Sequence, residues 1–221
     1  EHTVHRLPLI GWRAVTKLLY EQPKKSFGTE WTAPPDERLW RWRTSAQIAR
    51  EESGSFEVDS LMLRAGRTRA SEFVDRSWFL QYEKARNTGY NPPPDANALS
   101  ANYVWTRRDF DSRLFPTQGH GLSLDVGGGV TVGDGRYPFG RLVGRWLGYF
   151  PIGWKTDAAE RLGAVRGTRI AARAEFGAVV ANNAANLPTT QLFLTGGDNT
   201  VRGYAYRSIG VTLPDGQTAA G

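Results

Sequence analysis

Residues 39–51 read LWRWRTSAQIARE, and their alternation decides the fold. Tryptophan, alanine and isoleucine share one parity, whereas arginine, serine and glutamine share the other. The apolar set is Trp40, Trp42, Ala46 and Ile48, and the polar set is Arg41, Arg43, Ser45 and Gln47. Side chains with a period of two project to opposite faces of a β-strand. The stretch therefore predicts a strand with one apolar and one polar face.

The same alternation recurs along the rest of the chain. It is clear in residues 77–83, 99–106, 122–132 and 164–180, and weaker in residues 12–21, 57–69 and 138–150. Turn-rich spacers separate these stretches, at residues 52–55, 89–95, 133–135 and 182–188. Residues 22–38 and 150–162 read as long connections. No segment has a helical period, so we predict an all-β fold with about eight antiparallel strands.

Long strands with one apolar and one polar face fit two architectures. In a transmembrane β-barrel the apolar face contacts lipid and the polar face lines a wet lumen. In a soluble ligand-binding β-barrel the tryptophan and tyrosine face would instead enclose a pocket. Most of the aromatic residues lie near predicted strand ends, where aromatic rings anchor at the headgroup level of a membrane. They are Trp40, Trp42, Trp78, Trp105, Trp146, Tyr82, Tyr103 and Tyr149. This placement favours the membrane barrel.

Composition excludes several classes of function. The chain has 28 Lys and Arg against 22 Asp and Glu, but the basic residues recur singly on polar strand faces instead of forming a tail. Aromatic and basic residues take opposite faces, which argues against nucleic-acid binding. Cysteine is absent, so the chain has no disulfide and no thiolate nucleophile. No run of about 18 apolar residues exists, which excludes a transmembrane helix.

Candidate chemistry is sparse. The histidines His2, His5 and His120 lack the spacing of a metal cluster, so we expect neither a metal nor a cofactor. Asp125 and Glu175 are the one carboxylate pair of interest, but among so many arginines they are better suited to ion pairs than to acid–base catalysis. Without a serine near a histidine, we expect no enzyme and no catalytic residue. The predicted lumen wall comprises Asp125, Arg141, Arg145, Arg169, Arg173 and Glu175.

Residues 193–211 read FLTGGDNTVRGYAYRSIGV. The pair Gly196-Gly197 followed by Val201-Arg202-Gly203-Tyr204 resembles the sixth extracellular loop of the BamA/TamA (bacterial surface antigen) superfamily. Upstream, residues 115–124, FPTQGHGLSL, resemble a periplasmic turn of that family, and residues 179–188 resemble TamA more than BamA. The likeness is sharp over residues 97–211.

The resemblance implies a partial barrel over residues 1–221, with about eight strands of a barrel of about sixteen. Residues 182–221 would form the extracellular loop that folds into the lumen. The residues expected to lock that loop are Gly196, Gly197, Val201, Arg202, Gly203 and Tyr204, with Arg202 against acidic and aromatic groups on the wall. Nothing resembles the periplasmic POTRA domains of the family, so we expect an internal barrel fragment.

The resemblance also implies a role in the bacterial outer membrane, in assembly and insertion of outer-membrane proteins and autotransporters. Expected partners are outer-membrane lipid, client outer-membrane proteins or autotransporters, and a TamB-like periplasm-spanning protein bound through the missing POTRA domains. No nucleic-acid partner is expected. One alternative is a two-partner secretion transporter, which shares the barrel and the loop. The other, from a different class, is the soluble ligand-binding β-barrel.

Overall fold

A computed structural model describes residues 1–22, 24–53, 56–89, 94–112, 114–133, 135–152, 168–182, 185–188, 190–192, 211–212 and 218–219. Among these residues, no helix is long and apolar enough to cross a membrane.

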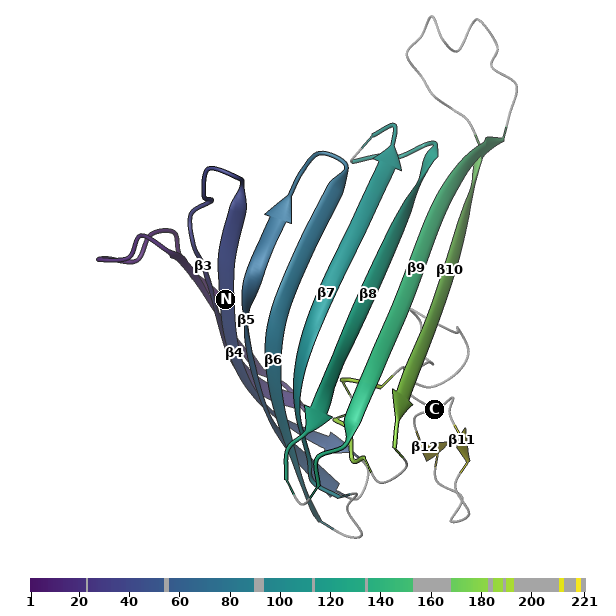
Figure 1. Ribbon diagram of the computed structural model, residues 1–221. Coiled ribbons are helices and arrows are strands. Elements are labelled where there is room, and N and C mark those ends of the chain that lie inside the picture. Colours follow the sequence, from purple (N-terminus) through teal and green to yellow (C-terminus); the bar gives the residue numbers. More distant parts are fainter. Residues whose placement is uncertain are drawn as a thin grey trace, which may run out of the picture.

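Ten strands form one antiparallel sheet in which each strand pairs with the next in sequence (Figure 1). A separate two-stranded sheet contains β11 (Val211–Thr212) and β12 (Thr218–Ala219). The ten strands are β1 (His2–Val4), β2 (Arg13–Tyr20), β3 (Lys24–Thr32), β4 (Trp40–Ser53), β5 (Phe56–Ala70), β6 (Val74–Gly89), β7 (Ala96–Phe110), β8 (Gly119–Thr131), β9 (Pro138–Ile152) and β10 (Thr168–Ala181). The all-β antiparallel prediction is therefore confirmed.

The sheet holds two strands more than the sequence pattern indicated. Residues 22–38, expected to be a long connection, contain β3 and a tight turn before β4. In that turn Asp36 Oδ1 accepts hydrogen bonds from the backbone N–H groups of Arg38 and Trp40, both at 2.9 Å. The pattern missed β3 because Phe27 and Trp31 are its only large apolar residues, and it missed β1 because that strand has three residues.

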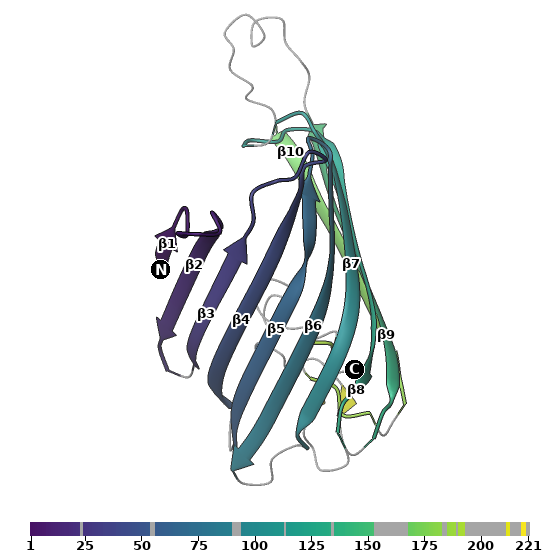
Figure 2. The same ribbon diagram turned by 60° about the vertical axis from the view of Figure 1, so that its left-hand side comes forward.

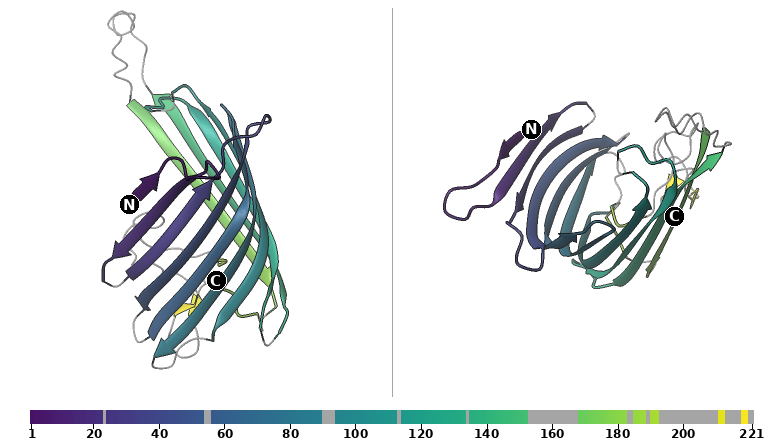
Figure 3. Two further views of the ribbon diagram at one scale, coloured as in Figure 1. Left: turned by 90° about the vertical axis from the view of Figure 1, so that its left-hand side faces the viewer. Right: turned by 90° about the horizontal axis from the view of Figure 1, so that it is seen from above.

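The sheet curves into an open trough, as the view from above shows (Figure 3). Within a strand, alternate residues point to opposite faces, and the strand registers align residues of the same face from one strand to the next. One face carries the apolar residues and is exposed; Leu80 is 54% and Phe176 53% accessible. The other, concave face holds buried polar residues such as Gln81, Glu83 and Ser100. Trp42 and Trp78 lie on the convex face, which is the opposite of what the soluble ligand-binding barrel requires.

Aromatic rings cover two of the three glycines on β9, Gly144 and Gly148, whereas the space at Gly140 is open. The ring of Phe176 on β10 occupies the place of a side chain at Gly144, where an added Cβ would lie 2.1 Å from Phe176 Cε1. At Gly148 the rings of Trp146 and Phe150 take that place. Aromatic rings that cover glycine in this way keep the sheet surface continuous. For this reason residues 138–150, in which glycines weaken the alternation of apolar and polar residues, still form a long strand.

The connection between β7 and β8 is organised by one carboxylate. Asp111 Oδ1 accepts hydrogen bonds from the backbone N–H groups of Thr117, at 2.9 Å, and Gln118, at 3.1 Å, and Oδ2 accepts one from the Thr117 hydroxyl. These bonds, chiefly that from the Thr117 side chain, lower the pKa of Asp111 from 3.8 to about 2. The turn therefore depends on an ionised aspartate.

We predict that Leu80→Arg destabilises the protein by about 2–4 kcal/mol, because it places a charge on the lipid-facing surface midway along β6. Gln47→Arg is the matched control: it adds the same charge at an exposed position of the concave face and should cost less than about 1 kcal/mol. Equilibrium unfolding in urea from lipid bilayers measures both. Equal costs for the two variants would contradict the assignment of the faces.

We predict that the turn at residues 111–118 keeps its structure to unusually low pH. A carboxylate with a lowered pKa stabilises the folded form above its ordinary value of 3.8, and this contribution disappears as the pH falls through about 2. NMR shifts of the Thr117 and Gln118 amides in detergent micelles should therefore titrate near pH 2. In Asp111→Asn the same shifts should stay flat. A midpoint at the ordinary value would contradict this role of Asp111.

Candidate functional site

The candidate site is the concave wall of the sheet. On β6 and β7 it carries four polar side chains that are almost completely buried: Gln81 is 5%, Glu83 3%, Ser100 2% and Asn102 7% accessible. Asn102 Nδ2 donates to Ser100 Oγ at 3.0 Å, so neighbours along the strand satisfy each other. Buried polar groups without partners are costly, so such a surface must form hydrogen bonds.

Ion pairs cover the wall on β8, β9 and β10. Arg141 Nη1 lies 2.7 Å from Asp125 Oδ2, and both side chains are largely buried. Arg145 and Arg173 both bind Glu175, at 2.8 Å each. Because the register places Glu175 directly opposite Arg145, the pairing across β9 and β10 follows from strand geometry. The concave wall thus brings these five predicted residues together as ion pairs, and each carboxylate is held by arginine.

The sixth predicted wall residue lies at the end of this cluster. Arg169 Nη1 donates a hydrogen bond to the Pro116 carbonyl oxygen, and its guanidinium Cζ lies 5.0 Å from the centre of the Tyr149 ring. Arg169 therefore ties the beginning of β10 to the connection before β8. It shares the face of the other wall arginines but not their ion-pair network.

The ion pair between Asp125 on β8 and Arg141 on β9 leaves two polar atoms without a hydrogen bond. Asp125 Oδ1 and Arg141 Nε are buried and have no partner among the described residues. Both atoms belong to a face that is wet in a membrane barrel. This part of the wall is therefore suited to bind a further polar group.

A hydrogen-bond chain on β5 and β6 was not predicted from the sequence. Arg64 Nε donates to Gln81 Oε1 at 2.8 Å, and its guanidinium Cζ lies 4.2 Å from the centre of the Phe79 ring. Gln81 Nε2 then donates to Glu83 Oε1 at 2.7 Å. The alternation assigns these residues to the polar face, but nothing in the spacing indicates that they form one chain.

Glu83 also binds a segment more than a hundred residues further along the sequence. Its Oε2 accepts hydrogen bonds from Thr190 Oγ1, at 2.6 Å, and from Gln191 Nε2, at 2.9 Å. Gln191 is 3% accessible, so its hydrogen bond to Glu83 is shielded from water, whereas Thr190 is exposed. The chain after β10 therefore returns to the concave side of the sheet and reaches the middle of β6. Only the tertiary structure reveals this contact, since no sequence pattern links the two segments.

The residues predicted to lock the lumen loop lie outside the described residues. They are Gly196, Gly197, Val201, Arg202, Gly203 and Tyr204. The prediction that residues 182–221 fold into the lumen stays a prediction, because only parts of that range are described. Within the described part of the chain, no group of three or more histidine and acidic residues could hold a metal ion.

We predict that Glu83→Gln loosens the returning segment at a cost of about 1–3 kcal/mol, because an amide offers one acceptor oxygen where three donors converge. Thr190→Val should lose little more in the Glu83→Gln background, giving a coupling energy of at least about 0.5 kcal/mol in a double-mutant cycle. Urea unfolding measures the cycle. Glu30→Gln, on the same face but bound only to exposed Arg43, is the control. Additive effects would show that Glu83 does not hold the segment.

Comparison with known proteins gives one family match. The model of the Omp85 superfamily domain matches residues 19–221, which include every strand from β3 to β12. A search of curated proteins found no match. Proteins of the matched family are outer-membrane β-barrels that assemble or secrete proteins, and they function with outer-membrane clients and partners. The alternating sheet with a lipid-facing convex surface agrees with that architecture. The match covers most of the chain, and the chain therefore belongs to the Omp85 superfamily.

Proposed function

We propose that the chain is the membrane domain of an assembly factor similar to TamA, which inserts other outer-membrane proteins, autotransporters in particular. The superfamily supplies the general role in assembly or secretion. The observation that carries the finer proposal is the open margin of the sheet at β1 and β2 (Figure 2).

At this margin the backbone of β2 is only partly covered. Strand β1 pairs with Ala14, Val15 and Thr16 and with no other β2 residue. Within the described residues, the stretch from Lys17 to Tyr20 therefore has a strand on one side only, that of β3. Its side chains are exposed, with Leu18 at 71% and Tyr20 at 78% accessibility. Unpaired backbone N–H and C=O groups template the addition of a further strand.

A membrane would make this edge reactive. Backbone groups without hydrogen bonds cost several kcal/mol each in hydrocarbon, so an open edge favours any strand that pairs with it. The strands at this margin are also short: β2 has 8 residues and β3 has 9, against 14 in β4 and 16 in β6. A spanning strand needs about 9–11 residues, so lipid beside the margin would thin to match it. Both effects lower the barrier to insertion of a client strand.

The concave side would stabilise the working barrel. In this proposal the returning segment fixed by Glu83 continues into the loop with Arg202, and the loop braces the wall from inside. A TamB-like periplasmic protein would deliver clients through POTRA domains joined to the barrel. None of these steps requires a catalytic residue, because strand exchange between hydrogen-bonding partners makes and breaks no covalent bond.

Assembly in liposomes tests the proposal. We expect the reconstituted protein to accelerate folding of a urea-denatured client barrel several-fold over empty liposomes, read from the heat-modifiable mobility of the client on gels. Equal rates would refute an assembly role. Export of one dedicated substrate, without any effect on barrel folding, would instead establish the two-partner secretion alternative.

A cysteine pair tests the edge itself. Because the chain has no cysteine, Leu18→Cys gives one defined thiol at the open edge. During assembly it should form a disulfide with a cysteine in the first or last strand of the client. Leu80→Cys is the control, since β6 is paired on both sides by β5 and β7. Equal cross-linking at both positions, or none at Leu18→Cys while the client folds, would exclude the β2 edge.

A further inference from the structure

Basic side chains line up across the convex face near the hairpin ends of β3 to β6. The register places Lys25 opposite Arg50, Arg50 opposite Asp59, and Asp59 opposite Arg86. Tyr20 of β2 lies opposite Lys25 and extends the row by one strand. Neighbouring strands are about 4.8 Å apart, so these five side chains form a compact polar row.

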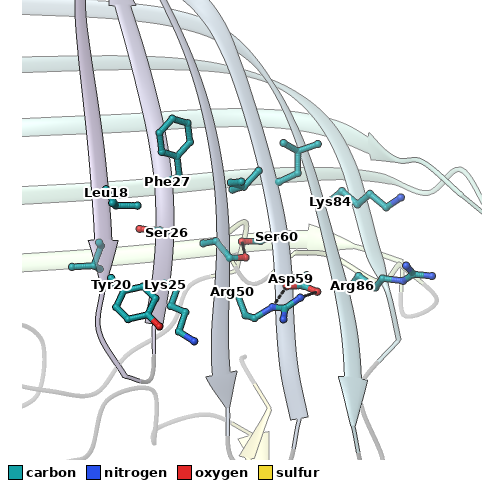
Figure 4. Close-up of a pocket in the computed structure, with 14 residues that line it drawn as sticks. Leu18, Tyr20, Lys25, Ser26, Phe27, Arg50, Asp59, Ser60, Lys84 and Arg86 are labelled. Carbon is teal, nitrogen blue, oxygen red and sulfur yellow. Dashed lines mark hydrogen bonds and ion pairs between the residues drawn. The ribbon is translucent and has the colours of Figure 1, made fainter. Parts of the chain in front are cut away.

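A second, mostly apolar row lies two residues away from the first on each strand, on the side farther from the hairpin ends. It contains Leu18, Phe27, Ile48 and Leu61, and it ends in Lys84 on β6. Together the two rows line a groove of about 690 Å³ (Figure 4). One side of the groove is therefore charged and the other is mostly apolar.

The groove keeps an excess of positive charge. Arg50 is bound by Asp59 in a bidentate pair, with Nε to Oδ1 at 2.7 Å and Nη2 to Oδ2 at 2.9 Å. The ammonium group of Lys25 lies 5.1 Å from the centre of the Tyr20 ring. Lys84 and Arg86 are exposed and form no ion pair with any described residue. The side chains that line the groove include four cations and one carboxylate, and the nearby carboxylate of Glu57 also attracts Arg50, so positive charge is in excess at this place.

We propose that this groove binds an anionic membrane lipid through its phosphate headgroup. Lys25, Lys84 and Arg86 would contact the phosphate oxygens, since arginine and lysine are the side chains that recognise phosphate in proteins. Arg50 is fixed by Asp59 and would help to place the headgroup. The acyl chains would lie along Phe27, Ile48 and Leu61.

The apolar row distinguishes a lipid from a soluble anion. A free phosphate would need the cations alone and would leave exposed Phe27 and Ile48 in contact with water. The convex face is also the lipid-facing face of this superfamily's barrels, so a headgroup meets the cations whenever the protein is in a bilayer. The proposal does not depend on client assembly.

Native mass spectrometry of the whole chain, released from micelles containing phosphatidylglycerol or phosphatidylcholine, tests the site. Both probes carry phosphate, but only phosphatidylglycerol has a net negative charge. We expect the wild type to retain phosphatidylglycerol at least about tenfold more tightly, because each nearby cation strengthens binding to an anionic headgroup. The triple variant Lys25→Gln/Lys84→Gln/Arg86→Gln, which leaves the Arg50–Asp59 pair intact, should lose this preference.

Two controls make the outcome decisive. Arg107→Gln removes a convex-face cation that is paired with Asp109 near the opposite ends of the strands, and it should keep the preference. Heat-modifiable mobility reports whether each variant folds; if the triple variant does not, Lys84→Gln alone should weaken the preference measurably. Equal retention of both lipids by the wild type, or an unchanged preference in the variants, would overturn the proposal. Displacement of the lipid by excess inorganic phosphate would show a site for free anions instead.

Discussion

The structure depends on the requirement that backbone hydrogen-bonding groups find partners within the protein. In hydrocarbon no water can bind an exposed N–H or C=O group, so strands must pair with strands. The chain meets this requirement in the simplest order, since each of the ten strands pairs with its sequence neighbour. Continuous pairing then fixes the side chains: a register that never slips keeps one parity toward lipid and the other toward the concave side. The features of both faces follow from that constraint.

On the concave side, most buried polar groups form hydrogen bonds or ion pairs. Asp125 and Arg141 are largely withdrawn from water there, and burial of such charges is tolerable only when opposite charges meet. Glu83 is the clearest case, because three donors from two distant parts of the chain converge on one buried carboxylate. A single side chain thereby connects the middle of the sheet to the segment after β10. The described part of the wall thus binds the returning segment through hydrogen bonds.

On the convex side, the distribution of charged residues and the length of the strands differ around the sheet. On β6 only Trp78, Leu80 and Tyr82 separate the outward cations Arg76 and Lys84, a band of about 27 Å along the strand at about 3.4 Å per residue. On β10 the outward positions from Ile170 to Val180 carry no charge at all. Beyond β3 toward the N-terminal margin, the strands become shorter. The proposed headgroup groove and the proposed edge for strand exchange therefore lie in the same half of the sheet, from β2 to β6.

The sequence by itself determined the all-β class, most of the long strands and the two faces of the clearest ones, because alternation at a period of two is a local property. It also indicated the family through the resemblance around Arg202. It placed Asp125, Arg141, Arg145, Arg173 and Glu175 on polar strand faces, where the structure joins them in ion pairs, and that this face lines a lumen stays a prediction. It missed β3, whose two large apolar residues give a faint pattern. Only the tertiary structure decided which strands are neighbours and which carboxylate receives the returning chain. The row from Lys25 to Arg86 depends on the register between successive strands, and the contact of Glu83 with Thr190 and Gln191 joins segments more than a hundred residues apart. Neither follows from the local pattern.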